Sequence, residues 1–183
     1  MAPNLALVGF MASGKSTVGR ICSERLGFAF LDTDKLVEDR SGMSVREVFE
    51  QWGEPRFREM ETAAVELAAM RDRVVIATGG GAVLLPRNVE ALRARCVVVY
   101  LSVSPQAVME RTEGDTSRPL LETGSEAARR LGVLLGQRES YYRSAAHAVV
   151  DGQSELPAAI AQRVISAYRG VAVRWFDLQG RGT

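Results

Sequence analysis

The residues with the most distinctive chemistry lie near the N-terminus, where residues 9–17 read GFMASGKST. Gly9, Gly14, Lys15 and Ser16 fit the spacing G-x-x-x-x-G-K-[ST] of a phosphate-binding loop. Glycines let successive backbone N–H groups turn around a phosphate, the lysine can reach the outer phosphates of a nucleoside triphosphate, and the serine hydroxyl can bind Mg²⁺. An apolar run precedes the loop and an amphipathic stretch follows it. This context favours nucleotide binding over the alternative, a glycine-rich turn that ends in an N-cap serine.

Two aspartates and three consecutive glycines follow other apolar runs. Asp32 and Asp34 are two residues apart. Beside a nucleotide site, one carboxylate could hold a metal ion while the other accepts a proton from a hydroxyl nucleophile. The alternative is that Asp34 caps the next helix, and both roles can coexist. Gly79, Gly80 and Gly81 carry an entropic cost that a simple turn does not require. We therefore expect another group to approach this backbone closely, with a flexible connection as the alternative.

Three arginines stand in apolar or aromatic surroundings: Arg58, Arg118 and Arg138. A planar guanidinium with several donors suits carboxylates and phosphates, so an anionic substrate would use such residues. Most arginines are solvated surface residues, and for any one of these three that remains the simpler interpretation.

These residues need elements that bring them together, and the sequence alternates short apolar runs with helical patterns. Strands are expected at 5–8, 28–31, 74–77, 97–101 and 148–150, and helices at 15–26, 34–41, 44–52, 55–70, 86–94, 105–111, 125–143 and 157–168. The strand runs are almost continuously apolar, which is typical of strands covered on both faces. The pattern predicts an α/β fold with helices on both faces of a parallel sheet, and ligands at the carboxyl ends of its strands. The polar stretch 114–124 is expected to be a loop.

Composition narrows the class of partner. A chain of 183 residues suits one domain, and a net charge of +1 gives no basic surface for nucleic acid or an acidic membrane. No apolar run approaches a membrane span and no signal-peptide pattern is present, so we expect a cytoplasmic protein that acts on small molecules. Cys22 and Cys96 are expected to be buried free thiols. Because His147 is the single histidine, a bound metal would need oxygen ligands.

Taken in order, the segments GFMASGKST, LDTD, FREME, TGGGA, RPLL and QRESYYR resemble the motifs of the shikimate kinase family. The resemblance runs from about the first residue to about residue 170. It implies a three-layer, nucleoside-monophosphate-kinase-like fold with a five-stranded parallel sheet. It also implies transfer of the γ-phosphoryl group of ATP to the 3-hydroxyl of shikimate, in the chorismate pathway to aromatic amino acids. ATP would be the cosubstrate, Mg²⁺ the metal ion, and the enzyme a monomer.

The resemblance assigns roles to individual residues. The ATP site would comprise Gly9, Ala12, Ser13, Gly14, Lys15, Ser16, Thr17, Arg111 and Arg118, with Mg²⁺ on Ser16 and Asp32. The shikimate site would comprise Asp34, Phe49, Phe57, Arg58, Gly79, Gly80, Gly81 and Arg138. Lys15, Asp34 and Arg118 would act in catalysis, with Asp34 as the base. Many members of the family have glycine at the position of Ala12, which the loop spacing leaves free.

The resemblance also implies a domain plan. Residues 1–170 would form one kinase domain, with a substrate-binding insertion at about 34–70 and a lid at about 112–124. Residues 171–183 would form a tail of unassigned role, which contains Trp175 and Phe176.

Two alternative functions stay open at this point. A gluconate kinase would not need the pair Arg58 and Arg138 to hold a carboxylate. A regulatory module that binds ligands without turnover usually lacks a catalytic group, whereas Lys15, Asp34 and Arg118 are all present.

Overall fold

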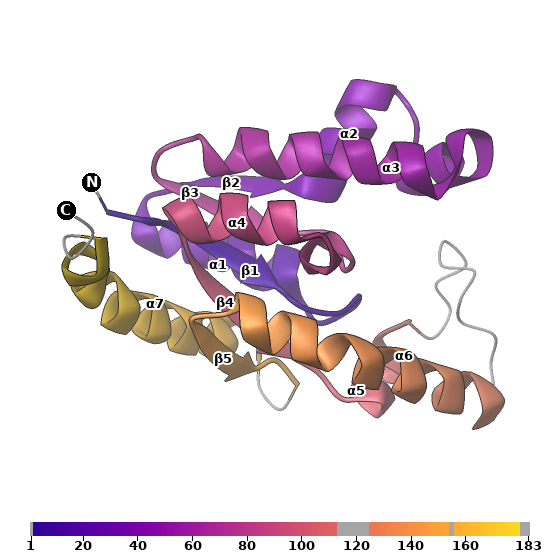
Figure 1. Ribbon diagram of the computed structural model, residues 1–183. Coiled ribbons are helices and arrows are strands. Elements are labelled where there is room, and N and C mark those ends of the chain that lie inside the picture. Colours follow the sequence, from indigo (N-terminus) through magenta and orange to yellow (C-terminus); the bar gives the residue numbers. More distant parts are fainter. Residues whose placement is uncertain (1, 113–124, 154–155, 180–183) are drawn as a thin grey trace.

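A computed structural model of the chain describes residues 2–112, 125–153 and 156–179 (Figure 1). Five parallel strands form one sheet in the order β2-β3-β1-β4-β5. Their bounds are β1 Asn4–Val8, β2 Ala29–Asp32, β3 Val74–Ala77, β4 Cys96–Ser102 and β5 Ala148–Asp151. Each strand end lies within one residue of its predicted position. The predicted five-stranded parallel sheet is therefore confirmed.

Helices cover both faces of this sheet. Within the described ranges they are α1 Lys15–Leu26, α2 Thr33–Ser41, α3 Val45–Ala69, α4 Pro86–Arg95, α5 Pro105–Thr112, α6 Ser125–Ala145 and α7 Pro157–Gln179, with a 3₁₀ turn η1 at Ala82–Leu84. α1 and α7 pack together on one face, whereas α3, α4 and α6 lie on the other (Figure 1). The side chains of β1 alternate between the two layers: Leu5 and Leu7 face α1 and α7, and Ala6 and Val8 face α3 and α4. This is the predicted three-layer α/β/α arrangement.

The prediction that every strand is covered on both faces is wrong for the two edge strands. β1 and β3 are buried along their whole length, and β4 is buried up to Leu101. β2 and β5 each pair on one side only, and Ala29 and Val149 are exposed. An edge strand with a short apolar sequence cannot be told from a central strand by its pattern alone.

α3 consists of two helical segments, as the sequence indicates. Its continuity is interrupted at Gly53, whose φ of 78° and ψ of 171° are not helical, two residues before Pro55. The first segment begins with a capping box, in which the Ser44 hydroxyl accepts from the Glu47 amide and the Glu47 carboxylate accepts from the Ser44 amide. This kinked helix, together with α2, forms the part of the chain predicted to be the substrate-binding insertion.

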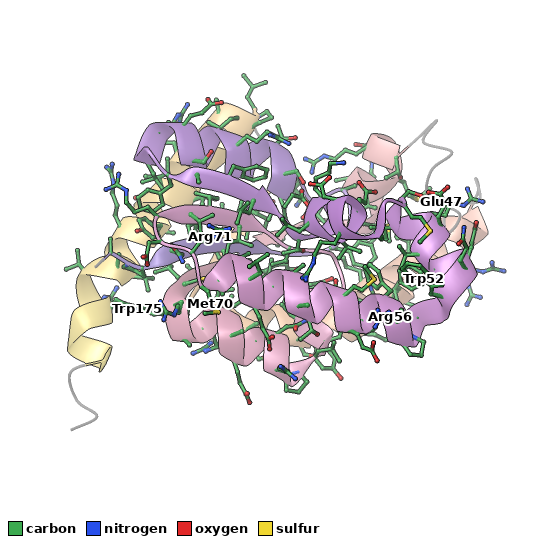
Figure 2. The ribbon with its side chains drawn as sticks, turned by 90° about the horizontal axis from the view of Figure 1, so that it is seen from above. Glu47, Trp52, Arg56, Met70, Arg71 and Trp175 are labelled. Atoms are coloured by element: carbon green, nitrogen blue, oxygen red, sulfur yellow. The ribbon has the colours of Figure 1, made fainter. Side chains whose placement is uncertain are left out.

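α7 continues through residue 170 without a break, so the first part of the predicted tail belongs to the helical layer. Trp175 is only 8% exposed and meets the His147 ring edge-on, with ring centroids 5.4 Å apart. Figure 2 shows Trp175 near one end of the molecule and Trp52, on the kinked part of α3, near the other. The Phe176 side chain and residues 180–183 lie outside the described part.

Both cysteines are free and buried, as predicted, and burial raises the pKa of each thiol to about 12. Among the helices of the described ranges, none is both long and apolar enough to cross a membrane.

His147 is hydrogen-bonded to Val98 of β4 through both its backbone and its ring. Its backbone N–H donates to the Val98 carbonyl over 2.8 Å, and its Nδ1 accepts from the Val98 amide over 2.9 Å. Only an unprotonated Nδ1 can accept this bond. Burial, and to a smaller extent the charge of Arg93, lower the pKa of His147 below its ordinary value of 6.5.

We therefore expect the free energy of unfolding to fall as the pH falls below about 6.5, because the unfolded chain then takes up a proton that the folded protein resists. The full contribution is present above that pH and is lost as the pH drops through the folded pKa. Denaturant titrations from about pH 8 to about pH 5 should show a steeper loss for wild type than for His147→Asn, which keeps an acceptor but does not titrate. Parallel pH profiles for the two proteins would contradict this role.

Candidate active site

The residues predicted to carry chemistry meet at the carboxyl edge of the sheet. The phosphate loop follows β1, Asp32 ends β2 and leads into α2, and Gly79–Gly81 follow β3, which lies between β1 and β2. Parallel strands bring their following segments to the same edge, where α/β proteins bind ligands. Three of the motifs are therefore brought together by the strand order.

The phosphate loop has the backbone shape that its glycines allow. Gly9 has φ 148° and Gly14 has φ 92°, and a Cβ on Gly9 would lie 2.6 Å from the carbonyl oxygen of Leu101. α1 begins at Lys15, so its first N–H groups open toward the loop. The Lys15 side chain is 8% exposed, and its Nζ donates to the carbonyls of Gly9 (2.9 Å) and Phe10 (2.7 Å). The loop is thus held in a curled shape by its own lysine.

The other predicted loop residues differ in burial. Ser13 is fully buried and its Oγ lies 3.3 Å from Lys15 Nζ, whereas Thr17 is exposed on the first turn of α1. Ala12 has φ 56°, in the left-handed region that favours glycine. The Ala12 carbonyl accepts from Arg111 (3.0 Å), which also donates to the Gly152 carbonyl (2.7 Å). Arg111 therefore ties the loop to the segment that follows β5.

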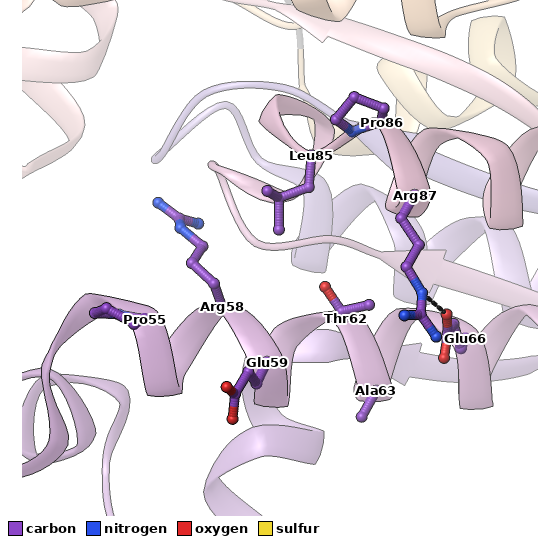
Figure 3. Close-up of a pocket in the computed structure, with 9 residues that line it drawn as sticks. All are labelled: Pro55, Arg58, Glu59, Thr62, Ala63, Glu66, Leu85, Pro86 and Arg87. Carbon is purple, nitrogen blue, oxygen red and sulfur yellow. Dashed lines mark hydrogen bonds and ion pairs between the residues drawn. The ribbon is translucent and has the colours of Figure 1, made fainter.

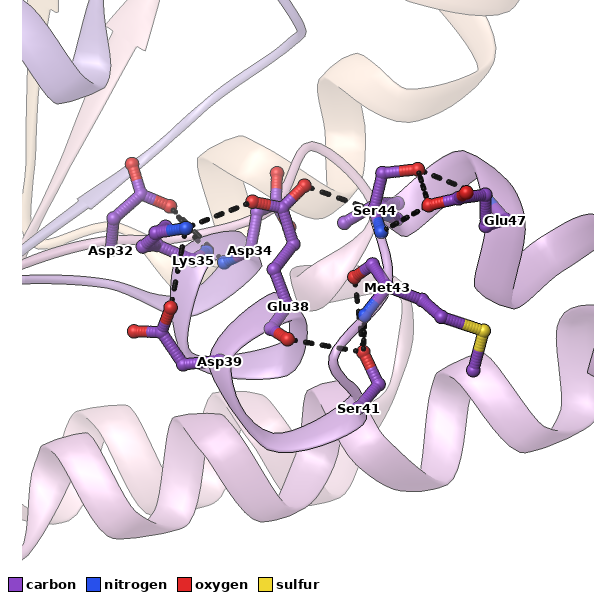
Figure 4. Close-up of polar contacts among 10 residues, drawn as sticks. Asp32, Asp34, Lys35, Glu38, Asp39, Ser41, Met43, Ser44 and Glu47 are labelled. Carbon is purple, nitrogen blue, oxygen red and sulfur yellow. Dashed lines mark hydrogen bonds and ion pairs between the residues drawn. The ribbon is translucent and has the colours of Figure 1, made fainter.

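Ser16 and Asp32 form the predicted pair of oxygen donors. The Ser16 hydroxyl donates to Oδ2 of Asp32 over 2.6 Å. The other carboxylate oxygen of Asp32 caps α2, accepting from the amides of Asp34 (3.1 Å) and Lys35 (3.5 Å) (Figure 4). The alternative that Asp34 caps this helix is therefore wrong, because the cap is Asp32.

The Ser16 hydroxyl and the Asp32 carboxylate lie next to the phosphate loop. This set of groups suits Mg²⁺, which is commonly bound by one or two protein oxygens together with phosphate and water. Among the described residues no group of three or more His, Cys, Asp and Glu side chains could hold a metal ion. A metal here would thus rely on nucleotide oxygens as well as on Ser16 and Asp32.

The three consecutive glycines are needed for space. None of them has a positive φ, but a Cβ on Gly79 would lie 2.5 Å from Oε1 of Glu61 and 2.6 Å from Oδ1 of Asp34. A Cβ on Gly81 would lie 2.5 Å from Nη1 of Arg58, and one on Gly80 would lie 3.3 Å from the Met11 amide. The predicted close approach to this backbone is confirmed: charged side chains of the site approach Gly79 and Gly81, and the Met11 backbone approaches Gly80.

Arg58 is fixed by two carboxylates on its own helix. Its Nη1 donates to Glu61 over 2.8 Å, and its Nη2 and Nε donate to Glu54 over 2.9 and 3.1 Å. The Glu61 side chain is only 1% exposed, and this burial raises the pKa of its carboxyl above the usual range. Arg58 and, more weakly, Arg138 oppose the rise, whereas Asp34 adds to it. These four charged groups therefore share one electrostatic environment.

Glu61 was not assigned a role from the sequence. Its signal was present in the segment FREME, where it stands three residues after Arg58 and so on the same face of a helix. An i,i+3 pair of this kind is usually an exposed surface contact, which is why the spacing did not single it out.

Arg138 and the two phenylalanines complete the described part of the predicted substrate site. The Arg138 guanidinium lies over the Phe10 ring, 5.8 Å from its centroid. The rings of Phe49 and Phe57 are 4.3 Å apart, but Phe57 is 4% exposed within a core cluster and Phe49 is 36% exposed. Phe57 thus packs in the core beneath the more exposed ring of Phe49. Arg118 and residues 113–124 lie outside the described residues.

A groove of about 410 Å³ lies beside this site, between α3 and the segment that leads into α4 (Figure 3). It is lined by Pro55, Arg58, Glu59, Thr62, Ala63, Glu66, Leu85, Pro86 and Arg87. At one end Arg87 Nε donates to Glu66 over 2.6 Å. Of these nine lining residues, Arg58 alone was predicted to belong to the site. The groove therefore adjoins the charged cluster without enclosing it.

A phosphate loop between β1 and α1, on a parallel sheet whose other charged residues gather at the same edge, defines a P-loop kinase that acts on a small molecule. A family model described as shikimate kinase matches residues 11–169. The chain belongs to the shikimate kinase family, whose members are ATP-dependent enzymes.

Individual relatives and structures agree with this membership. The chain is 46% identical over 169 residues to a shikimate kinase of Moorella thermoacetica, covering 92% of this chain and 96% of the relative. A shikimate kinase of Halorhodospira halophila is 43% identical over 164 residues, covering 90% and 92%. The structure of a shikimate kinase from Acinetobacter baumannii in complex with shikimate is 36% identical, with a TM-score of 0.87 over 93% of this chain and 95% of that one. A gluconokinase from Sinorhizobium meliloti, 19% identical with a TM-score of 0.66 over 97% of each chain, shares the fold.

We expect Gly9→Ala to lower the free energy of unfolding by about 2 kcal/mol or more, because an alanine at this φ is strained and its Cβ meets a backbone carbonyl that cannot move aside. Gly136→Ala is the matched control, since Gly136 lies within α6 with no atom near its added Cβ. The control should raise stability by about 0.5–1 kcal/mol. Urea denaturation measures both changes, and a Gly9→Ala protein as stable as wild type would refute the loop geometry.

Proposed function

We propose that the protein transfers the γ-phosphoryl group of ATP to the 3-hydroxyl of shikimate, giving shikimate 3-phosphate and ADP. The observation that carries the proposal is the convergence of Asp34, Arg58 and Glu61 on the backbone of Gly79–Gly81. This cluster combines a fixed guanidinium for a carboxylate with an acidic group for a hydroxyl, which are the two functional groups of a hydroxylated acid. The phosphate loop lies at the same edge of the sheet.

The first step is recognition of the substrate's acid group. We assign this to Arg58 and Arg138; the charges of both act on the buried carboxyl of Glu61, which supports placing them in one site. Glu54 and Glu61 hold the Arg58 fork in a defined orientation before substrate arrives. The backbone of Gly79–Gly81 and the Phe49 ring are proposed to line the same site, with Phe57 behind Phe49.

The second step is the transfer itself. Phosphoryl transfer depends mainly on alignment and on neutralising charge, with little covalent help from the protein. We assign the proton of the attacking hydroxyl to Asp34, which leads from β2 into the site and whose Oδ1 approaches the Gly79 backbone. Lys15 would exchange the carbonyls of Gly9 and Phe10 for the phosphates of ATP.

Ser16 and Asp32 are proposed to hold Mg²⁺ together with the phosphates. When bound, the ion would supply positive charge that offsets the negative charge of the phosphates. The Ser16 hydroxyl, which donates to Oδ2 of Asp32 here, would then face the metal instead. Oδ1 of Asp32 would still accept from the Asp34 amide and so cap α2.

The remaining roles follow from position. Arg111 joins the phosphate loop to the Gly152 carbonyl, and we propose that it packs against adenine there. We keep the proposal that Arg118 acts on the transferred phosphate from a lid at about 112–124. We also propose that the enzyme works as a monomer in the cytoplasm.

A gluconate kinase is the nearest alternative function, since a gluconokinase shares the fold. A coupled assay of ADP release with shikimate, its carboxamide analogue, gluconate and nucleoside monophosphates decides between them. Shikimate should give the highest kcat/KM, at least about tenfold above the carboxamide, because the amide removes the charge that the arginines bind. Equal use of the acid and the carboxamide, or preference for gluconate, would refute the proposal.

We expect Arg58→Lys and Arg138→Lys each to raise the KM for shikimate by about tenfold or more while the KM for ATP stays nearly unchanged. Lysine keeps the charge but loses the planar pair of donors that fits a carboxylate. Arg87→Lys is the control, because Arg87 pairs with Glu66 at the far end of the groove. Steady-state kinetics with both substrates test this, and an unchanged KM for shikimate in both lysine variants would remove the arginine pair from the site.

A further inference from the structure

Tyr142 on α6 links the substrate arginine Arg138 to the glycine segment, although neither the motifs nor the comparisons assign it a role. Its side chain is fully buried, and its hydroxyl donates to the carbonyl oxygen of Gly80 over 2.6 Å. Gly80 lies between the two glycines that Asp34, Glu61 and Arg58 approach. A hydroxyl from α6 is therefore hydrogen-bonded to the same glycine segment that the charged side chains approach.

Arg138 stands four residues earlier on α6, so its side chain lies on the same face of the helix as Tyr142, and its charge acts on the phenol. Burial raises the pKa of Tyr142 to about 12, against the lowering influence of Arg138, so the phenol stays protonated. A neutral phenol has one proton to give and lone pairs with which to accept. Because the proton goes to Gly80, the guanidinium of Arg138 can meet this oxygen only as a donor.

The ring of Tyr142 is held separately from its hydroxyl. It stacks on Tyr100 of β4, with centroids 5.0 Å apart and planes 18° from parallel. The Tyr100 hydroxyl donates to Glu139, which also accepts from Arg143 over 2.7 Å. Two buried tyrosines thus share one stack, but their hydroxyls point to different partners. This provides a comparison within the same protein.

We propose that Tyr142 is a positioning residue that fixes Arg138 relative to the Gly79–Gly81 backbone, and so sets the geometry with which the site receives the substrate's carboxylate. The inference rests on the proposed function, in which Arg138 binds that carboxylate. The Tyr142 hydroxyl is bonded to the glycine segment and its side chain lies beside Arg138 on α6, so it restricts where the arginine can lie relative to that segment. Without it, Arg138 keeps its place over Phe10 but loses its link to Gly80.

The test compares Tyr142→Phe with Tyr100→Phe. Each removes one buried hydroxyl and leaves the aromatic stack intact, so a purely structural role would affect both in the same way. For Tyr142→Phe we expect the KM for shikimate to rise about five- to tenfold, the KM for ATP to stay within about twofold, and the melting temperature to stay close to that of Tyr100→Phe. Tyr100→Phe should leave both KM values within about twofold of wild type.

A second comparison isolates the link to Arg138. In an Arg138→Lys background, adding Tyr142→Phe should raise the KM for shikimate by less than about twofold, because the guanidinium that the hydroxyl orients is already gone. An unchanged KM in Tyr142→Phe, an equal change in Tyr100→Phe, or full additivity with Arg138→Lys would each overturn the inference. Failure of the wild-type protein to phosphorylate shikimate would instead overturn the proposed function, which separates the two outcomes.

Discussion

Parallel pairing of β1 with β3 on one side and β4 on the other is the constraint from which the site follows. Leu5 aligns with Val75 and with Val97, so the chain leaves all three strands at the same edge. Backbone hydrogen bonds between buried strands leave little freedom for this register. The phosphate loop and the glycine segment are consequently placed within one region, and the pairing of β2 with β3 adds the residue that caps α2.

A buried carboxylate provides the next level of order. Glu61 lies almost out of reach of solvent, where an unpaired charge would be strongly unfavourable, and Arg58 is its direct partner. Such a pair is weak evidence for stability, because desolvation offsets the attraction. Its effect here is orientation, since the Arg58 fork is held between Glu61 and Glu54 with its position already determined. Preorganisation of this kind lowers the entropy that substrate binding must overcome.

Much of this arrangement could be predicted from the sequence, and the failures have physical causes. The phosphate loop was predictable because its chemistry depends on backbone shape, which Gly9 and Gly14 reveal directly. Glu61 and Tyr142 were not, because burial and long-range partners decide their roles and neither is encoded in local spacing. Glu61 belongs to an ordinary helical i,i+3 pair until α3 packs on the sheet. The exposed outer sides of β2 and β5 were missed for the same reason, since strand order is a property of the whole chain.

The crowding at Gly79–Gly81 also bears on how this scaffold could acquire a new substrate. A side chain added at Gly79 or Gly81 would displace charged side chains of the site, so a substitution there removes old contacts before it can create new ones. The side chains that surround this segment come from helices, among them Asp34 of α2, Arg58 of α3 and Arg138 of α6. A change of specificity in this architecture is therefore expected to come from exchange of helical residues around an unchanged Gly79–Gly81 backbone.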